Sequence, residues 1–593
     1  MFAVGRNVRL NVFTRPSSLV LCKQVSTTTN ATPERKHGTY RTPEKGDFKV
    51  EYELAERLAA TGLWGPNKKG FWTAEEKKIR SIGDKARINI VNESVCKDII
   101  SYIGPGLERH KGCDLLDIYP GAGLWSETLH NFLKPRSHIL MEPDDTLYKP
   151  FLQPLLDKPN TTLVPASGLV WRDLNDVLSP KYLPHQKVPD PDKLGERNDT
   201  LLITANIAFH PKRRFLKFES VAHLVLYQFI DAIRTGALYQ KYGLVRMLIW
   251  TRPDDKFGIL PKVLQKRKKL SIETELSCDW VREVCGQEAM DSTWFMRDSI
   301  TDAASDLATW KRMRAQGIKM PAERSSDALI EAKAASRSKE KIEPGVTPPA
   351  FKRSFLDELA TLEAQHEKEI FDKDSATYRK MRSYRWRANW EHRKHQRMQQ
   401  LIAGLDAINK LHKEGKASPE ELKKREDEWE AELMKNPSGF VAQFITYKDG
   451  LHIYRQDPPV MFYDRRAYDR MVIQPEEFYP NVPISLLDIQ PKAVHPLLRQ
   501  KGPNSTRVGD CFELLLSAIM SQSILPLDKT LDNIMPGFSA YIMPRWTSLR
   551  DVKRGGLLTN TPHSQLTARM LNARQWEEFL PLLRELSYPE RQV

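Results

Sequence analysis

The first half of the chain alternates short apolar runs with longer helical patterns. The clearest run, residues 113–119, ends at Pro-Gly-Ala-Gly, and a helical pattern follows from about Leu124. Such a run predicts a buried strand that leads through a tight turn into a helix. Similar runs recur at residues 138–142, 163–165, 201–205 and 244–250. Strands that alternate with helices at this spacing predict a parallel sheet covered on both faces by helices.

The pattern changes between about residues 301 and 451, where charged residues become dense, glycine is rare and helical stretches replace strands. Residues 351–371 predict one helix. Ser418, Pro419, Glu420 and Glu421 form a capping box with proline at the first helical position, which predicts that another helix begins there after Gly415 ends the previous one. Strand-like sequence then returns, most clearly at residues 484–489.

The charge of the chain favours a polyanionic partner. Its 593 residues include 91 Lys and Arg against 76 Asp and Glu, a formal net charge of +15. Lysine and arginine gain affinity by releasing the counterions condensed on phosphates. No apolar run reaches the roughly 18 residues of a membrane-spanning helix. We therefore expect nucleic acid as the partner and no membrane span.

The first residues have the composition of a mitochondrial presequence. Residues 1–33 contain no acid, carry Arg6, Arg9, Arg15 and Lys23 among apolar residues, and are rich in hydroxyl side chains. This pattern is typical of an amphipathic import signal, with a disordered basic tail as the alternative.

The six cysteines suggest neither a disulfide framework nor a metal site, because they are scattered and no CxxC is present. Cys278 and Cys285 are seven residues apart, which is a helical spacing, and we expect them to be packing thiols.

The strongest chemical signal is the turn that follows the first strand. Asp117 ends the strand, and Gly121 and Gly123 allow the backbone to approach a bound cofactor. Glu142 follows the second strand, where a carboxylate can accept hydrogen bonds from ribose hydroxyls. The three glycines of a nicotinamide fingerprint are not present, and a purely structural strand-to-helix turn is the alternative interpretation.

A second loop is expected at the same edge of the sheet. The strand at residues 201–205 ends at Asn206, and Phe209 follows three residues later. An asparagine amide beside an aromatic ring suits a flipped adenine, because the amide can bond N6 and the ring can stack on the base. Inherited packing is the alternative. We expect the two loops to meet in one cationic cleft.

The order and spacing of these segments resemble the S-adenosylmethionine-dependent rRNA adenine N6-dimethyltransferases and the mitochondrial transcription factor B proteins descended from them. The resemblance covers roughly residues 87–261 and the chain from Met461 onward. It implies a Rossmann-like class I methyltransferase α/β sheet with a long helical insertion and a small helical C-terminal domain. It also implies that S-adenosylmethionine would be held by Asn89, Asp117, Gly121, Gly123, Glu142, Ser167 and Asn206, and that Asn206 and Phe209 would be catalytic.

Three departures from the family pattern bear on activity. Tyr119 stands where the enzymes carry the first glycine of the cofactor loop, Ser167 where they use an aspartate for the adenine amine, and Ala208 where they have a proline. A missing charge-assisted hydrogen bond costs roughly 1.5 to 3 kcal/mol. With the loss of the glycine this predicts cofactor binding about 100-fold weaker or lost, and no efficient methyl transfer.

The loop Asp-Ile-Tyr-Pro-Gly and the residues from Trp250 to Pro253 resemble the fungal transcription factor branch more than the bacterial enzymes. This resemblance implies a mitochondrial matrix protein, monomeric on its own, that assists the mitochondrial RNA polymerase in recognising and melting promoter DNA. An active dimethyltransferase of the mitochondrial small-subunit rRNA is the alternative, and a ribosome-assembly or scaffold role is a third possibility.

Three basic segments are candidates for phosphate contact. Lys212, Arg213 and Arg214 follow the second loop, and residues 262–269 include Lys266, Arg267, Lys268 and Lys269. An ordinary solvated surface is the alternative for both. Residues 378–397 carry eight Lys or Arg against one Glu, together with Trp386 and Trp390. These tryptophans suit either stacking on nucleic acid or a core stripe that continues to Leu401 and Leu405.

The expected organisation has five segments. They are a mitochondrial presequence and disordered tail (1–45), a methyltransferase-like α/β domain (46–300), a charged helical insertion with a linker (301–451), a return to the last strand of the sheet (452–495) and a helical C-terminal domain (496–593).

Overall fold

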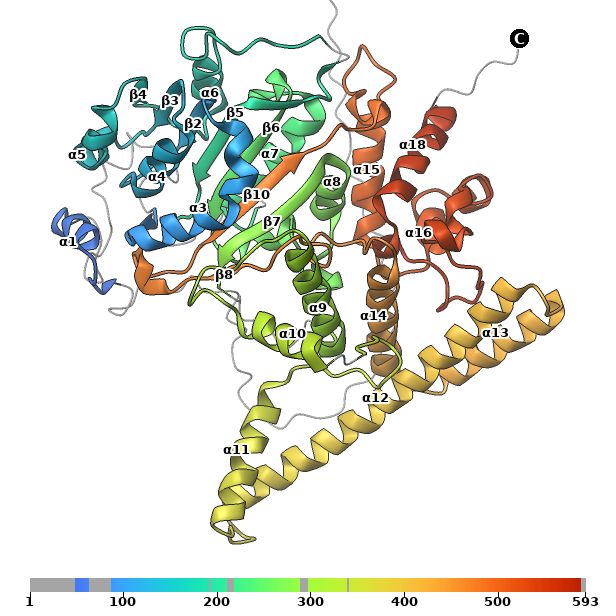
Figure 1. Cartoon of the computed structure of the whole chain (residues 1–593). Helices are drawn as coiled ribbons and strands as arrows, with labels where there is room; N and C mark the ends of the chain where they lie inside the picture. The colour runs from blue at the N-terminus through green and yellow to red at the C-terminus, as the bar shows by residue number, and fades with distance from the viewer. Residues whose placement is uncertain are drawn as a thin grey trace, which may run out of the picture. The chain divides into compact units, whose positions relative to one another are not determined.

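The computed structural model describes residues 48–62, 87–190, 193–210, 218–287, 297–338 and 341–587. Its centre is an eight-stranded sheet with the strand order β4-β3-β2-β5-β6-β10-β7-β8 (Figure 1). The strands are β2 (Asp114–Ile118), β3 (Ser137–Met141), β4 (Thr161–Val164), β5 (Arg197–Asn206), β6 (Leu244–Thr251), β7 (Cys278–Gly286), β8 (Met471–Val472) and β10 (Ser485–Pro491). A separate pair joins β1 (Asn89–Ile90) to β9 (Phe478–Tyr479). The predicted presequence lies outside the described residues.

Five neighbouring strands, β4, β3, β2, β5 and β6, run parallel. In chain order they have the sequence 3-2-1-4-5 of a doubly wound sheet. The fold class predicted from the apolar runs is therefore confirmed. The sheet is not wholly parallel, because β10 lies antiparallel between β6 and β7. A strand that arrives so late in the chain cannot be placed in the sheet by its own periodicity.

Helices cover both faces of the parallel strands. Successive side chains of β2 point to opposite faces, so Leu116 and Ile118 join one core and Leu115 joins the other. The first core includes α7 (Val221–Thr235) and α8 (Lys269–Ser277), and the second includes α3 (Glu93–Leu107) and α4 (Leu124–Leu133). Further helices among the described residues of this part are α1 (Glu53–Ala60), α5 (Asp145–Leu156) and α6 (Trp171–Val177).

Strand β7 corrects one interpretation of the sequence. Cys278 and Cys285 are buried thiols, as expected, but they lie on a strand and not on a helix. Seven residues is an odd number, so the two side chains point to opposite faces of the sheet and join different cores. The charged residues between them, Asp279, Arg282 and Glu283, conceal the strand pattern.

Within the described residues, six α-helices lie between β7 and β10: α9 (Ser299–Ala315), α10 (Asp327–Ser338), α11 (Ser354–Lys368), α12 (Ala376–Glu414), α13 (Pro419–Met434) and α14 (Ser438–Arg455). The predicted boundary between α12 and α13 is confirmed. Gly415 ends α12 with a positive φ of 62°, and the Ser418 side chain accepts a hydrogen bond from the Glu421 amide. Helices α12, α13 and α14 share a core of their own, to which α12 contributes Met398, Leu401 and Leu405. Met313 of α9 and Leu329 of α10 instead join the second core of the sheet.

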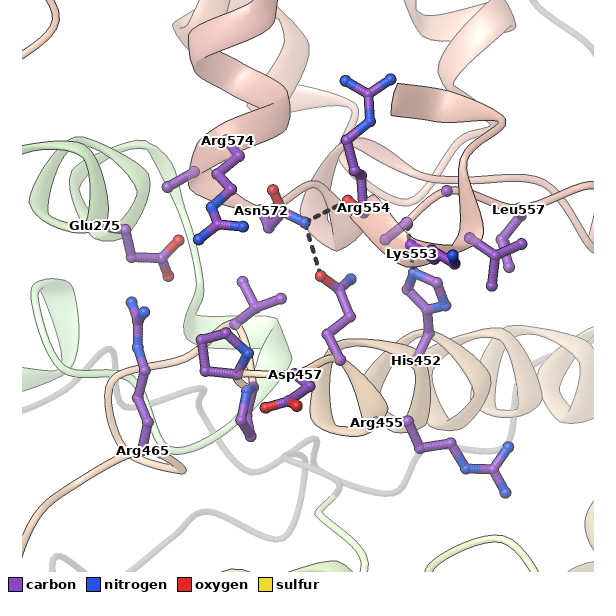
Figure 2. A pocket seen from close by; sticks show the side chains of 18 of the residues that line it. Glu275, His452, Arg455, Asp457, Arg465, Lys553, Arg554, Leu557, Asn572 and Arg574 are labelled. Carbon is purple, nitrogen blue, oxygen red and sulfur yellow. Dashed lines mark hydrogen bonds between the residues drawn. The ribbon is translucent and has the colours of Figure 1, made fainter. Parts of the chain in front are cut away.

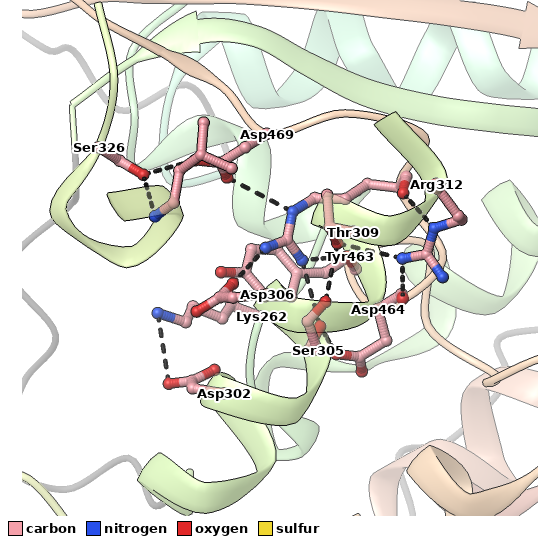
Figure 3. A network of polar contacts seen from close by, with 12 residues as sticks. Lys262, Asp302, Ser305, Asp306, Thr309, Arg312, Ser326, Tyr463, Asp464 and Asp469 are labelled. Atoms are coloured by element: carbon pink, nitrogen blue, oxygen red, sulfur yellow. Dashed lines mark hydrogen bonds and ion pairs between the residues drawn. The ribbon is translucent and has the colours of Figure 1, made fainter. Parts of the chain in front are cut away.

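Helix α9 is fixed by polar contacts to the segment that leads back to the sheet (Figure 3). Arg466 donates to Ser305 Oγ at 3.2 Å and forms an ion pair with Asp306. Ser305 Oγ in turn donates to Asp464 Oδ1 at 2.8 Å, and Lys262 pairs with Asp302 at 3.5 Å. Since buried charges are costly unless they are paired, this network fixes how the first inserted helix lies against residues 461–470.

The last part of the chain contains α15 (Val508–Ser521), α16 (Leu527–Ile534), α17 (Phe538–Ile542) and α18 (Ala573–Ser587). The Trp546 and Phe579 rings stack with their centroids 4.6 Å apart. Arg267 connects this part to α8, because its guanidinium pairs with Glu275 at 2.5 Å and donates to the backbone oxygens of Arg569 and Leu571. Among the described helices, none is long and apolar enough to span a membrane.

Candidate cofactor site and nucleic-acid interface

The turn after β2 is built as the sequence predicts. Gly121 and Gly123 have positive φ angles of 60° and 81°, which glycine adopts without strain. Asn89 Oδ1 accepts a hydrogen bond from the Ala122 amide at 3.0 Å, and a Cβ atom at Gly121 would collide with that same oxygen. Asn89 and both glycines therefore form one unit. Much of their role here is to hold the turn itself.

Glu142 lies beside this turn and is fully buried. Its carboxylate forms a two-pronged ion pair with Arg87, in which Nη1 donates to Oε2 at 2.6 Å and Nη2 donates to Oε1. The Gly121 amide donates to it at 3.2 Å and the Asp144 amide at 3.0 Å. Burial raises the pKa of Glu142, although the charge of Arg87 opposes that shift. Both carboxylate oxygens are thus already bound to groups of the protein.

Arg87 is enclosed by aromatic rings. Its guanidinium carbon lies 4.7 Å from the ring centroids of both Tyr119 and Tyr148, and none of its surface is exposed. A planar guanidinium stacks well on aromatic faces, so the two rings complete the burial of the ion pair. We refer to Arg87, Glu142, Tyr119 and Tyr148 as the Arg87 clamp.

Tyr119 keeps a backbone conformation that suits glycine. Its φ is +61°, which costs a residue with a Cβ roughly 1–2 kcal/mol. The side chain is fully buried, and its hydroxyl lies 2.6 Å from Ser167 Oγ in a hydrogen bond. The two departures from the family pattern at 119 and 167 are therefore in contact. The Tyr119 ring and its hydrogen bond to Ser167 occupy the space between these two positions.

Asp117 is not part of this cluster. Its carboxylate lies 3.7 Å from His138 Nε2 in the interior, and His138 Nδ1 lies 3.0 Å from His130 Nδ1. The side chain is 2 % exposed, on the side of the sheet that carries Leu115 rather than with Glu142. None of these contacts brings Asp117 to the residues expected to bind the cofactor.

The second loop contacts the first one, and the cationic cleft expected between them stays a prediction. The Phe209 and Tyr119 rings are in edge contact at 6.2 Å, and Asn206 lies at the end of β5. Asn206 Nδ2 donates to the Ile88 carbonyl at 2.9 Å, and its Oδ1 accepts from the Ala208 amide at 3.2 Å. Both polar atoms of the amide are used by the backbone. This favours the packing interpretation of Asn206 in this conformation.

Comparison with known proteins identifies the sheet. Residues 87–282 match the family "Ribosomal RNA adenine dimethylase". This part of the chain is similar to that family, and we refer to residues 87–282 as the dimethylase domain. The match ends within β7, directly before the inserted helices.

The chain is also similar to individual proteins of known name. Mitochondrial transcription factor 1 of Saccharomyces cerevisiae is 24% identical over 166 residues, which is 28% of this chain and 45% of the yeast protein. The chain thus matches less than half the length of that relative. The crystal structure of a dimethyladenosine transferase from Plasmodium falciparum aligns with 11% identity and a TM-score of 0.22, covering 50% of this chain and 94% of that one.

Arg87 is the residue of the dimethylase domain that sequence reasoning missed. It stands two positions before Asn89, but its partner Glu142 is 55 residues further along the chain. A single arginine in an apolar segment gives no sign of which carboxylate it meets. The only sequence signal is that a charged residue beside the apolar Ile88 and Ile90 needs a partner if it is buried.

The basic segments of the dimethylase domain are only partly available to phosphates. Lys212, Arg213 and Arg214 lie outside the described residues. Arg267 is corrected to a buried structural residue, 1 % exposed and bound to Glu275. Lys269 forms ion pairs with Glu273 and Glu513, at 3.7 and 3.0 Å. Lys266 is half-buried near the Phe257 ring, and Lys268 is exposed.

An open cavity of about 850 Å³ lies where the dimethylase domain meets α12, α14 and the C-terminal part (Figure 2). Among the acids that line it, Glu275 is paired with Arg267 and Asp406 with Arg455. Arg574, Lys553 and Asp457 have no ion-pair partner among the described residues, so the unneutralised charge of the wall includes both cations and an acid. Sequence patterns missed this cavity because its walls come from widely separated segments.

Proposed function

We propose that this protein is a mitochondrial transcription initiation factor that uses a dimethylase fold to bind promoter DNA and to assist the mitochondrial RNA polymerase. It works in the mitochondrial matrix and does not transfer methyl groups efficiently. The similarity to mitochondrial transcription factor 1 supports the transcriptional role. The net charge of +15 supports a nucleic-acid partner. The composition of residues 1–33 supports import.

The Arg87 clamp is the observation that carries the loss of methyl transfer. By resemblance to the enzymes, Glu142 would bind the ribose of S-adenosylmethionine, yet its carboxylate is fully buried and engaged by Arg87. Tyr119 and Ser167 are bonded to each other across the positions that would hold the amino-acid end and the adenine of the cofactor. The residues present do not fit S-adenosylmethionine. Binding would require the ion pair to break and the Tyr119 ring to leave its pocket.

Calorimetry with S-adenosylmethionine tests this part of the proposal. The full chain should give no heat of binding at cofactor concentrations up to about 100 μM, because breaking the clamp costs several kcal/mol. An active dimethyladenosine transferase serves as the positive control. Submicromolar affinity for the cofactor would contradict this account of Tyr119 and Ser167 and would favour the rRNA dimethyltransferase alternative.

A gel-shift experiment tests the transcriptional part. The protein should shift a mitochondrial RNA polymerase onto promoter DNA that contains a premelted bubble. A scrambled duplex of equal length is the matched control, and it should give a weaker shift because it offers neither promoter nor unpaired strand. Absence of any shift with the promoter bubble would favour the ribosome-assembly or scaffold role.

A further inference from the structure

Helix α12 exposes two tryptophans. Trp386 is 66 % exposed and Trp390 is 47 % exposed, although large aromatic side chains usually bury most of their surface. The two residues are four apart, so they lie on one face, with their Cα atoms about 6 Å apart along the helix axis. A pair of neighbouring indoles left in solvent marks a surface that a partner covers.

The packing of α12 explains why these residues are uncovered. They continue the apolar stripe of Leu401 and Leu405, but the core shared with α13 and α14 begins only at Met398. Toward the start of the helix the packed residues are instead Met381 and Tyr384, which lie on the opposite side and include a Tyr384 ring contact with Phe355 of α11. Helix α12 extends well beyond α13 (Figure 1). Its apolar stripe therefore continues past the residues that α13 and α14 cover.

The charge around the tryptophans selects the kind of partner. Arg382 lies one turn before Trp386 and Arg393 nearly one turn after Trp390, and both are exposed. Neither has an ion-pair or hydrogen-bond partner among the described residues. Glu391, the one acid of this segment, is 8 % exposed and faces Arg353. The face thus presents indole rings and unneutralised arginines without a competing carboxylate.

We infer that this face, Arg382, Trp386, Trp390 and Arg393, binds an unpaired nucleic-acid strand. Each indole offers exposed ring surface on which one base can stack, and the arginines reach the phosphates on either side. Lys394 Nζ lies 5.2 Å from the Trp390 ring centroid and adds a cation beside that ring. A duplex hides its base faces, so it could use the arginines but not the tryptophans. Neither stacking nor phosphate contact reads the sugar, so DNA and RNA strands should bind alike. The inference stands whether or not the protein acts in transcription.

Fluorescence anisotropy with labelled dT and U oligomers of about 20 nucleotides tests the inference on the full chain. Base stacking contributes about 1–3 kcal/mol per base. The double variant Trp386→Ala/Trp390→Ala should therefore bind both strands about 30-fold more weakly or worse. Because both side chains are exposed, its thermal unfolding should match that of the unmodified protein. Leu514→Ala, which removes a side chain 73 % exposed on α15, is the matched control and should not change the affinity.

A second variant separates stacking from charge. Arg382→Gln/Arg393→Gln should reduce the slope of log K against log salt by about 1.4, because each phosphate contact on a single strand contributes about 0.7. Trp386→Phe/Trp390→Phe should recover part of the lost affinity, since phenyl rings also stack. Equal binding of a duplex and a single strand, or unchanged affinity in the tryptophan double variant, would overturn the inference and leave this face to a protein partner.

Discussion

Replacing Arg87 by alanine tests the closed cofactor site most directly. In the folded protein the Glu142 carboxylate is fully buried and accepts two hydrogen bonds from Arg87, with only the Gly121 and Asp144 amides as further donors. Arg87→Ala leaves that carboxylate without its counter-charge in a dry site. Removing one partner of a buried ion pair costs about 3–5 kcal/mol, and we expect the free energy of unfolding to fall by that amount.

The assay is urea unfolding combined with amide hydrogen exchange in β2 and β3, which flank the clamp. Exchange in these strands should accelerate, because they open more easily when Glu142 loses its partner. The control is Arg87→Met/Glu142→Gln. This double variant removes both charges together and should recover most of the lost stability, since a neutral pair leaves no uncompensated charge.

The pH dependence of Arg87→Ala gives a second readout. Burial already raises the pKa of Glu142, and loss of the guanidinium removes an influence that lowers it. A carboxyl whose folded pKa is raised binds its proton more tightly folded than unfolded, so the folded variant gains stability as pH falls toward 5. The deficit relative to the unmodified protein should therefore shrink in acid. A loss below about 1 kcal/mol at pH 7.5, or a deficit that grows in acid, would show that Glu142 is not a buried ion and would refute the closed site.

Four further outcomes are expected, three from contacts described above and one from the charge of residues 212–214. Arg267→Ala should destabilise the protein by about 3–5 kcal/mol in urea unfolding while leaving the salt slope of DNA binding unchanged, because Arg267 is buried and Glu275 would lose its partner. The triple alanine variant of Lys212, Arg213 and Arg214 should lower the salt slope of DNA binding and leave the free energy of unfolding unchanged. An unchanged slope would show that these residues do not contact the phosphates. Burial lowers the pKa of His452 to about 4; a histidine held neutral in the fold loses stability as pH falls below 6.5, so about 1–2 kcal/mol should disappear by pH 5 and less in His452→Gln. Ser418→Ala should cost about 1 kcal/mol in thermal unfolding by removing the cap of α13, and Ser418→Asp should restore it.

The parallel part of the fold could be predicted because its strands are buried on both faces. Runs such as residues 113–119 are continuous in apolar character and end at glycine or proline, so position and type are both visible. β7 was missed because it carries Asp279, Arg282 and Glu283 at its partly exposed positions. The place of β10 between β6 and β7 is a matter of long-range pairing, which no local pattern specifies.

The candidate site was predictable in its turns and not in its contacts. Gly121 and Glu142 were found because turn geometry and position after a strand are local properties. The pairing of Glu142 with Arg87 depends on tertiary structure, and so does the bond between Tyr119 and Ser167. The exposed tryptophans show the same limit of prediction from local sequence patterns. A helical period shows that Trp386 and Leu401 share a stripe, but not how far along it the neighbouring helices reach.

The pairing of β7 with β10 allows part of the inserted helical segment to vary in length. Leu486 lies opposite Cys285, so the chain leaves the sheet and returns to it at adjacent positions. Loop-closure entropy grows only with the logarithm of length, so a detour of about 200 residues costs roughly 4 kcal/mol more than a two-residue turn. The core that α12, α13 and α14 share can offset this cost in loop-closure entropy. Related chains could therefore lengthen, shorten or replace α12 and α13, whereas β8, β9 and the residues of α9 and α10 that pack on the sheet tie the rest of the segment to the strands.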